Sequence, residues 1–220
     1  MEQSVEVQVL SPAPILQKRL PMKKVLSIQR SNQSHWVGDG FPVKSLLAYT
    51  QGAELISPFL LLDYAGPHYF PPSQKRLGVG SHPHRGFETV TIVYEGEVEH
   101  RDSAGAGGLI QNGDVQWMTA GSGLVHEEWH GKNFAKTGGM FEMVQLWVNL
   151  PKKDKMTNPR YQEITQKNIP QIELPHKAGT LSVIAGQYLT TAGAAKTFSP
   201  INLWNIKVHS GTKTELQVPD

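Results

Sequence analysis

Glycine and proline interrupt this sequence at short intervals, with 21 glycines and 15 prolines in 220 residues. They fall between short segments rich in valine, isoleucine, leucine, threonine and aromatic residues. This spacing predicts many short β-strands rather than long helices, because glycine and proline end regular elements. We therefore expect an all-β protein, a barrel or a sandwich, with strands at 88–94, 97–102, 113–120, 140–150, 180–186 and 201–209.

The stretch 103–108 reads SAGAGG and lies between two of these predicted strands. Its small residues predict a turn or loop only. A short connection of this kind usually joins neighbouring strands, so we expect 97–102 and 113–120 to be antiparallel neighbours.

Composition excludes several classes of protein and site. The chain has no cysteine, so disulfides, thiolate zinc sites, iron–sulfur clusters and cysteine nucleophiles are excluded, and any metal must be held by His, Asp or Glu. The net charge of +2 is too small to indicate a nucleic acid as the main partner. The longest apolar run, 55–64, is broken by Pro58 and Asp63. We therefore expect no membrane span, and a cytoplasmic protein.

Two segments depart from the strand pattern and suggest domain boundaries. Residues 1–24 contain three prolines and a small basic cluster, which predicts a solvated tail; Met22 is an alternative start to Met1 that the sequence leaves open. Residues 151–173 are rich in lysine and proline and are expected to connect an N-terminal domain, 25–150, to a C-terminal one, 174–220.

Two short motifs carry ligand-type side chains. His82-Pro83-His84 and His126-Glu127-Glu128 each place such residues at positions i and i+2, which point to one face of an extended strand. If the two strands are neighbours, His82, His84, His126 and Glu128 converge on one ion at about 2.0 to 2.2 Å. This ligand set suits iron, copper, nickel, manganese or zinc and leaves positions open, which indicates catalysis. Because ligand imidazoles must be neutral, we expect metal loss toward about pH 5 to 6.

Other titratable residues compete for a role at this site. Glu88 is an alternative fourth ligand if the strand after His84 continues unbroken. Gly86 permits a bulge, however, and Glu88 would then orient a ligand histidine by accepting a hydrogen bond from the free N–H of its imidazole. His100 is expected to support the ligands from behind or to lie at the surface, and His130 to face solvent. Large side chains on the predicted strands either pack the core, which is the default, or wall the pocket: Trp117, Met118, Phe141, Met143 and Trp147.

The motifs resemble the pirin family of the cupin superfamily. The matching stretches, covering roughly residue 25 to the end, are GSHPHRGFETVT (80–91), EHRDS (99–103), GDVQWMTAG (113–121) leading into HEE (126–128), QLWVNLP (145–151) and PRYQ (159–162). The resemblance implies a bicupin of two stacked jelly-roll β-barrels, with one metal ion, usually Fe²⁺, in the N-terminal barrel. The family's three histidines and one glutamate fall on His82, His84, His126 and Glu128.

The resemblance implies two functions. Bacterial pirins are similar to quercetin 2,3-dioxygenases, which open a flavonol ring with O₂ and release carbon monoxide; Glu128 would then be both ligand and catalytic base. The alternative is a nuclear, non-enzymatic, iron-binding transcriptional coregulator whose binding to a protein partner depends on the metal's oxidation state. A basic patch beside the metal would favour the alternative, and only Arg85, Arg101 and scattered lysines are available. A structural cupin with vestigial metal binding is the third reading.

Two features depart from the general cupin pattern. TAG (119–121) replaces the usual Pro-x-Gly before the second ligand motif, and the spacing to Gly96 suits Thr89 better than Glu88. Residues 174–220 are also too few for a second barrel of roughly 100 residues. We therefore expect an incomplete C-terminal barrel whose strand edges need covering, and the oligomeric state stays open.

Overall fold

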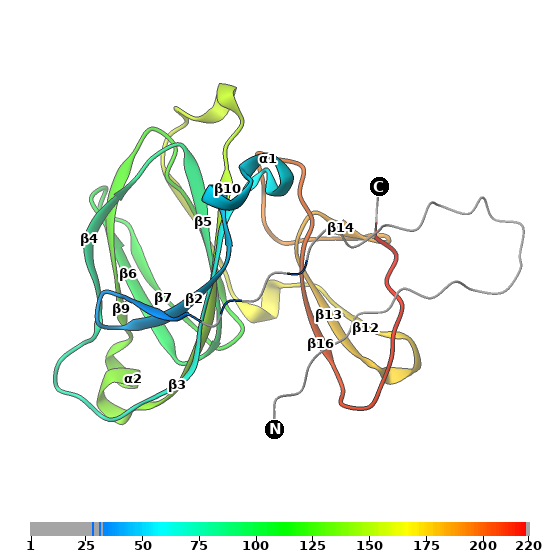
Figure 1. Ribbon diagram of the computed structural model, residues 1–220, viewed down its shortest axis with the longest axis horizontal. Helices are drawn as coiled ribbons and strands as arrows, with labels where there is room; N and C mark the ends of the chain where they lie inside the picture. The colour runs from blue at the N-terminus through cyan, green and yellow to red at the C-terminus, as the bar shows by residue number, and fades with distance from the viewer. Residues whose placement is uncertain (1–27, 29–30, 32, 219–220) are drawn as a thin grey trace, which may run out of the picture.

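The computed structural model describes residues 28, 31 and 33–218, and in Figure 1 these form two lobes side by side. The predicted N-terminal tail, 1–24, and Met22 lie outside the described residues. Among the helices that the structure describes, none has the length and apolar character needed to cross a membrane.

Strands dominate both lobes, and helices are short. The seven-stranded sheet follows the order β1 (His35–Val37), β2 (Phe41–Ala48), β3 (Phe59–Phe70), β10 (Gly139–Asn149), β5 (Phe87–Glu95), β8 (Val115–Thr119) and β11 (Arg160–Ile164). The four-stranded sheet is β4 (Gly78–His84), β9 (Leu124–His130), β6 (Glu97–Asp102) and β7 (Gly107–Gln111), with β4 and β7 at its edges. These two sheets form the N-terminal lobe.

The C-terminal lobe is smaller. Its three-stranded sheet is β12 (Gln171–Glu173), β13 (Gly179–Ala185) and β16 (Leu203–Val208), beside the pair β14 (Gln187–Tyr188) and β15 (Thr191–Ala192). The helices are α1 (Ala53–Ile56) and α2 (Lys132–Thr137), with 3₁₀ turns at Tyr49–Gln51, Lys152–Asp154, Gln166–Asn168 and Pro175–Lys177.

The all-β, cupin-type architecture is confirmed, and each of the six predicted strand segments contains a strand. Two local predictions are wrong. Gly107 and Gly108 belong to β7 rather than to a loop. β6 pairs with β7 and β9, whereas β8 lies in the other sheet between β5 and β11. A jelly roll returns the chain to the opposite sheet, so nearness in sequence does not imply strand pairing here.

The interior of the N-terminal lobe is apolar at one end. An aromatic and aliphatic cluster joins the two sheets and α2 through ten buried residues: Phe41, Val43, Ala65, Phe70, Val93, Val98, Ile110, Phe134, Phe141 and Met143. Because these side chains come from both sheets, they hold the two sheets face to face.

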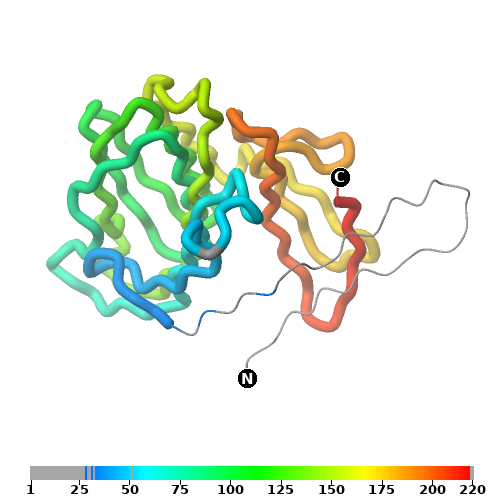
Figure 2. The backbone as a smooth tube through the Cα atoms, turned by 45° about the horizontal axis from the view of Figure 1, so that its top comes forward, coloured from blue at the N-terminus to red at the C-terminus, as the bar shows by residue number. Residues whose placement is uncertain are grey.

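The opposite face of the seven-stranded sheet is also buried, because the C-terminal lobe covers it. Val90 and Ile92 of β5 and Leu146 of β10 pack in one cluster with Ile184 of β13 and with Ile201. Figure 2 shows the chain of the C-terminal lobe running alongside the N-terminal lobe. The two lobes therefore share an apolar core.

The C-terminal lobe has a small core of its own and fewer strands than the N-terminal lobe. Leu174, Leu181, Val183 and Tyr188 are buried in it. The predicted connector, 151–173, is not free of strands, because β11 pairs with β8 and β12 pairs with β13. The domain boundaries themselves stay a prediction.

Candidate metal centre

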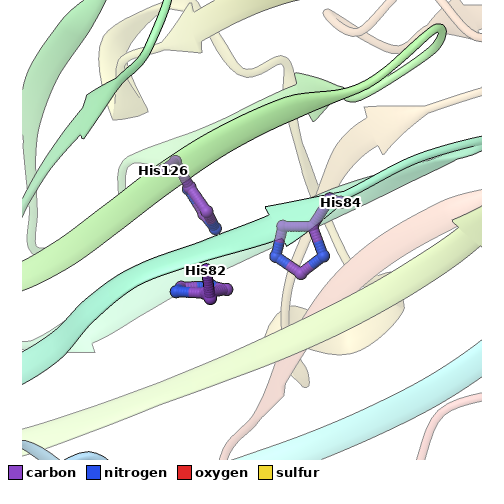
Figure 3. A group of neighbouring side chains, drawn as sticks. All are labelled: His82, His84 and His126. Carbon is purple, nitrogen blue, oxygen red and sulfur yellow. The ribbon is translucent and has the colours of Figure 1, made fainter.

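Two neighbouring strands of the four-stranded sheet bring the histidine motifs together. β4 pairs antiparallel with β9, and His82 lies directly opposite His126. Each of His82, His84 and His126 offers a ring nitrogen, and these three atoms lie within 4.8 Å of one another. Figure 3 shows the three rings gathered beside the two strands. The predicted convergence of the three imidazoles is present.

Hydrogen bonding leaves ring nitrogens available for an ion. His82 Nδ1 lies 2.8 Å from the carbonyl oxygen of Gly80, which fixes the proton on Nδ1 and leaves Nε2 free. Both ring nitrogens of buried His126 have no hydrogen-bond partner among the described residues. Buried polar atoms are rarely left unpaired, so the arrangement fits a bound metal ion.

The surroundings keep two of the imidazoles neutral. Burial lowers the pKa of His84 to about 3, and His126 and His82 act in the same direction. Burial likewise lowers the pKa of His126 to about 3, assisted by His82 and His100. Since only a neutral imidazole binds a metal ion, His84 and His126 are ready ligands at neutral pH.

Glu128 lies beside the triad on β9. Its carboxylate is buried, and Oε2 is 3.9 Å from Nε2 of His126. Two atoms bound to one ion at about 2.1 Å can be up to about 4.2 Å apart, so this separation suits a shared ion. Burial raises the pKa of Glu128, while His82, Gln145 and His100 oppose that change. The side-chain amide of Gln145 donates to both carboxylate oxygens, each at 3.3 Å.

His100 is behind Glu128, inside the barrel. It lies opposite Glu128 in the β6–β9 ladder, is only 2% exposed, and stacks on Tyr161 with ring centroids 5.1 Å apart. The surface alternative for His100 is therefore wrong. Burial lowers the pKa of His100, and neither ring nitrogen has a partner among the described residues. A supporting role toward Glu128 stays a prediction.

Glu88 lies on the other face of the seven-stranded sheet. Its cross-strand partner Val148 belongs to the core shared with the C-terminal lobe, and its Oε1 accepts a hydrogen bond from Thr119 Oγ1 at 2.7 Å. Glu88 is 0% exposed, and burial raises its pKa. Gly86, with φ of 78°, makes a left-handed turn between β4 and β5. The two strands belong to different sheets, so strand parity does not carry from His84 to Glu88.

The expectation that His130 faces solvent is wrong. It is 2% exposed, its Nε2 lies 2.8 Å from the carbonyl oxygen of Gly40, and its ring stacks on Phe141. Most of the large side chains that could have walled the pocket pack in apolar clusters instead: Trp117, Met118, Phe141 and Met143.

Trp147 and Gln145, on β10, are the exceptions that reach the site. The ring of Trp147 lies edge-on to His84, with centroids 5.5 Å apart, and its Nε1 donates to Gln145 Oε1 at 3.2 Å. Sequence reasoning missed Gln145. The alternation of the predicted strand could have indicated it. Gln145 is a polar residue next to apolar Leu146, so the two side chains point to opposite faces of the sheet.

A jelly-roll barrel with three converging histidines that could hold a metal ion defines a protein of the cupin type with a candidate metal centre. Comparison with known protein families narrows this class, because the family model described as Pirin matches residues 40–148. The chain belongs to the pirin family.

Several relatives are similar over most of this chain. A Pseudomonas aeruginosa protein named "Putative quercetin 2,3-dioxygenase" is 60% identical over 90% of this chain and 69% of its own length. A "Pirin-like protein" of Solanum lycopersicum is 37% identical over 92% of this chain and 63% of its own. The crystal structure of a quercetin 2,3-dioxygenase from Acinetobacter baumannii matches with a TM-score of 0.88 and 58% identity, over 90% of this chain and 69% of that one. The chain thus spans about two thirds of these relatives.

Proposed function

We propose that this chain is a metal-dependent dioxygenase that opens the ring of a flavonol such as quercetin with O₂. Convergence of His82, His84 and His126 inside the barrel is the observation that carries the proposal. The names of relatives at 58 to 60% identity support the choice of reaction. A cytoplasmic location accompanies this proposal as a prediction.

The proposed ligands are the three histidines and Glu128, holding one divalent ion, with Fe²⁺ as our first choice and copper, nickel, manganese or zinc as alternatives. The ligand set supports this range, because imidazole and carboxylate both bind borderline metals. When bound, the ion would act as a Lewis acid that lowers the pKa of the flavonol 3-hydroxyl group.

Glu128 would accept the proton of that hydroxyl group at a carboxylate oxygen. The carboxylate is buried beside the imidazoles, so one of its oxygens can bind the ion while the other accepts the proton. The amide of Gln145 holds the carboxylate in place from the opposite sheet. Glu128 is therefore proposed as both a ligand and the catalytic base.

Aromatic side chains border one side of the triad. Phe87 and Trp147 lie with ring centroids 4.6 Å apart, and each lies within about 5.5 Å of the His84 ring, at 5.1 and 5.5 Å. A planar flavonol packs well against aromatic rings, so these two side chains are suited to orient it beside the metal.

The test is loss of the quercetin absorbance band under air by metal-loaded protein. We expect turnover by the wild type, and a loss in kcat/KM of about 100-fold or more for Glu128→Gln, the range for removal of a catalytic base. Glu127→Gln is the matched control, because Glu127 is the next residue on β9 and points to the other face. Metal content is measured for each variant. Absence of turnover by the metal-loaded wild type with any flavonol would contradict the proposal.

The alternative function is an iron-dependent coregulator that binds a protein partner, with a nuclear location. It shares the metal site but predicts metal binding without flavonol turnover. The same experiment therefore separates the two functions.

A further inference from the structure

We propose that Gln145 is a positioning residue that orients the Glu128 carboxylate, and that Trp147 in turn fixes the Gln145 amide. The inference rests on the proposed role of Glu128 as a ligand. Both residues lie on β10 of the seven-stranded sheet, whereas Glu128 projects from β9 of the opposite sheet. The contact therefore crosses the barrel interior.

The amide nitrogen of Gln145 is equally distant from the two carboxylate oxygens of Glu128. Nε2 is 3.3 Å from each oxygen of Glu128 and 3.4 Å from Oγ1 of Thr91 on β5. One of its hydrogens can therefore serve the carboxylate while the other serves Thr91. A donor equally distant from both oxygens resists rotation of the carboxylate plane, since rotation would lengthen one of the two contacts.

Trp147 decides which way the Gln145 amide points. An indole Nε1–H can only donate, and it donates to Gln145 Oε1 at 3.2 Å. The opposite amide orientation would place NH₂ against this N–H, and the amide oxygen against the Glu128 carboxylate. Both contacts would be repulsive, so the amide presents its donor to Glu128.

The indole of Trp147 packs against His84, which is one of the proposed ligands, and against Phe87. It lies edge-on to His84, with centroids 5.5 Å apart, and is tilted against Phe87, with centroids 4.6 Å apart. One series of contacts therefore runs from His84 through Trp147 and Gln145 to Glu128. It joins a ligand on β4 to a ligand on β9 through a strand of the facing sheet.

A supporting residue of this kind should act on metal affinity. Partners that orient metal ligands typically change affinity by about 10- to 100-fold when they are removed. Gln145→Leu keeps the size of the side chain and removes its donor. Trp147→Phe keeps an aromatic ring beside His84 and removes the N–H together with the second ring of the indole.

The experiment titrates metal-free protein with Co²⁺ in competition with a coloured chelator and records the visible spectrum of the Co²⁺ protein. We expect Kd to rise about 10- to 100-fold for Gln145→Leu and to rise less, about 3- to 10-fold, for Trp147→Phe, with a changed spectrum in both. Thr89→Val is the control. Thr89 is buried on β5 directly opposite Trp147 but makes no hydrogen bond through its hydroxyl among the described residues.

A double variant separates positioning from general damage to the fold. If Gln145 acts through Glu128, then Gln145→Leu should cost little additional affinity once Glu128→Gln is present. Fully additive losses, or an unchanged Kd and spectrum in both Gln145→Leu and Trp147→Phe, would overturn the inference. If Gln145→Leu does not fold, Trp147→Phe alone decides. These readouts need no flavonol, so failure of the proposed reaction would leave this test intact.

Discussion

The two faces of the seven-stranded sheet differ sharply although they are built from the same strands. On β10, Gln145 and Trp147 point inward to the candidate metal centre, whereas Leu146 and Val148 point outward into the core shared with the C-terminal lobe. β5 follows the same rule, with Thr91 inside and Val90 outside. Alternation along each strand thus places the candidate site and an apolar cluster on the inner face, and the core shared with the C-terminal lobe on the outer face.

The difference assigns the described part of the C-terminal lobe to packing, because its side chains bury the outer face of the sheet. In the part of the chain that the structure describes, the three converging imidazoles all come from β4 and β9, while Ile184 and Ile201 of the lobe pack on the far side of the sheet. Changes on the inner face should therefore act on metal binding, and changes on the outer face on unfolding.

The largest effect is expected on the inner face. Replacing His82 and His84 together by Gln should weaken metal binding by about 1,000-fold or more, about 4 kcal/mol, because two of the four proposed ligands are removed. Isothermal titration of the metal-free protein measures it. The control replaces exposed His35 and His176 by Gln, and full metal occupancy in the first variant would refute the site.

On the outer face, Ile184→Ala should lower the free energy of unfolding by about 3 kcal/mol, because the side chain is 1% exposed in the shared core. Metal affinity should change less than twofold. Urea unfolding and metal titration measure the two quantities, with exposed Leu189→Ala as the control. A loss of metal affinity as large as the loss of stability would show that the two faces are not independent.

The free energy of unfolding should fall in acid because buried His84 resists protonation. In the metal-free protein, the pKa of His84 is about 3 in the folded state and about 6.5 when unfolded, so below pH 6.5 the unfolded chain binds a proton that the folded chain does not. The stability contributed by neutral His84 is present above pH 6.5 and is lost between about pH 6.5 and 3. Between pH 7 and 5, wild type should lose about 2 kcal/mol more unfolding free energy than His84→Gln. Equal losses in urea unfolding would contradict this assignment.

The same low pKa values refine the expectation for the metal. Ordinary imidazole pKa values predict metal loss toward about pH 5 to 6. The low pKa values of His84 and His126 favour retention of the ion at more acid pH, whereas the raised pKa of Glu128 favours earlier loss of the carboxylate ligand, so metal loss toward about pH 5 to 6 stays the prediction.

The smallest effect is expected at Glu88, the buried carboxyl group on the outer face. Its raised pKa means that its stabilising contribution is present below the unfolded pKa and is lost as pH rises through the folded pKa. At pH 7, Glu88→Gln should therefore raise the free energy of unfolding by about 1 kcal/mol, and the gain should shrink below about pH 4.5. Urea unfolding at pH 7 and pH 4 tests this, with exposed Glu173→Gln as the control. A destabilised variant at pH 7 would assign Glu88 a favourable charge interaction instead.

Sequence reasoning anticipated the histidine triad because the i, i+2 spacing places His82 and His84 on one strand face, and the assumed pairing with the strand of His126 is present. It did not place Glu88, because Gly86 turns the chain from one sheet to the other and resets which side chains point inward. Such a turn cannot be read from alternation, which holds only within one strand.

Long-range pairing was the other obstacle. The glycines of β7 have no side chains that would display strand periodicity, so Gly107 and Gly108 resembled a loop. The contact between Gln145 and Glu128 joins strands of facing sheets and depends on how the barrel closes. The alternation with Leu146 places Gln145 on the inner face, but no local pattern names Glu128 as its partner.

β4 lies at an edge of its sheet, and this position has a kinetic consequence. Among the described strands it pairs with β9 alone, and this ladder is interrupted by a register shift between Val79 and His82. Parting this single ladder would separate His82 and His84 from His126 while the rest of the barrel stays closed. A bound ion would then exchange with solution through this local opening, at a rate that is not limited by unfolding of the whole protein.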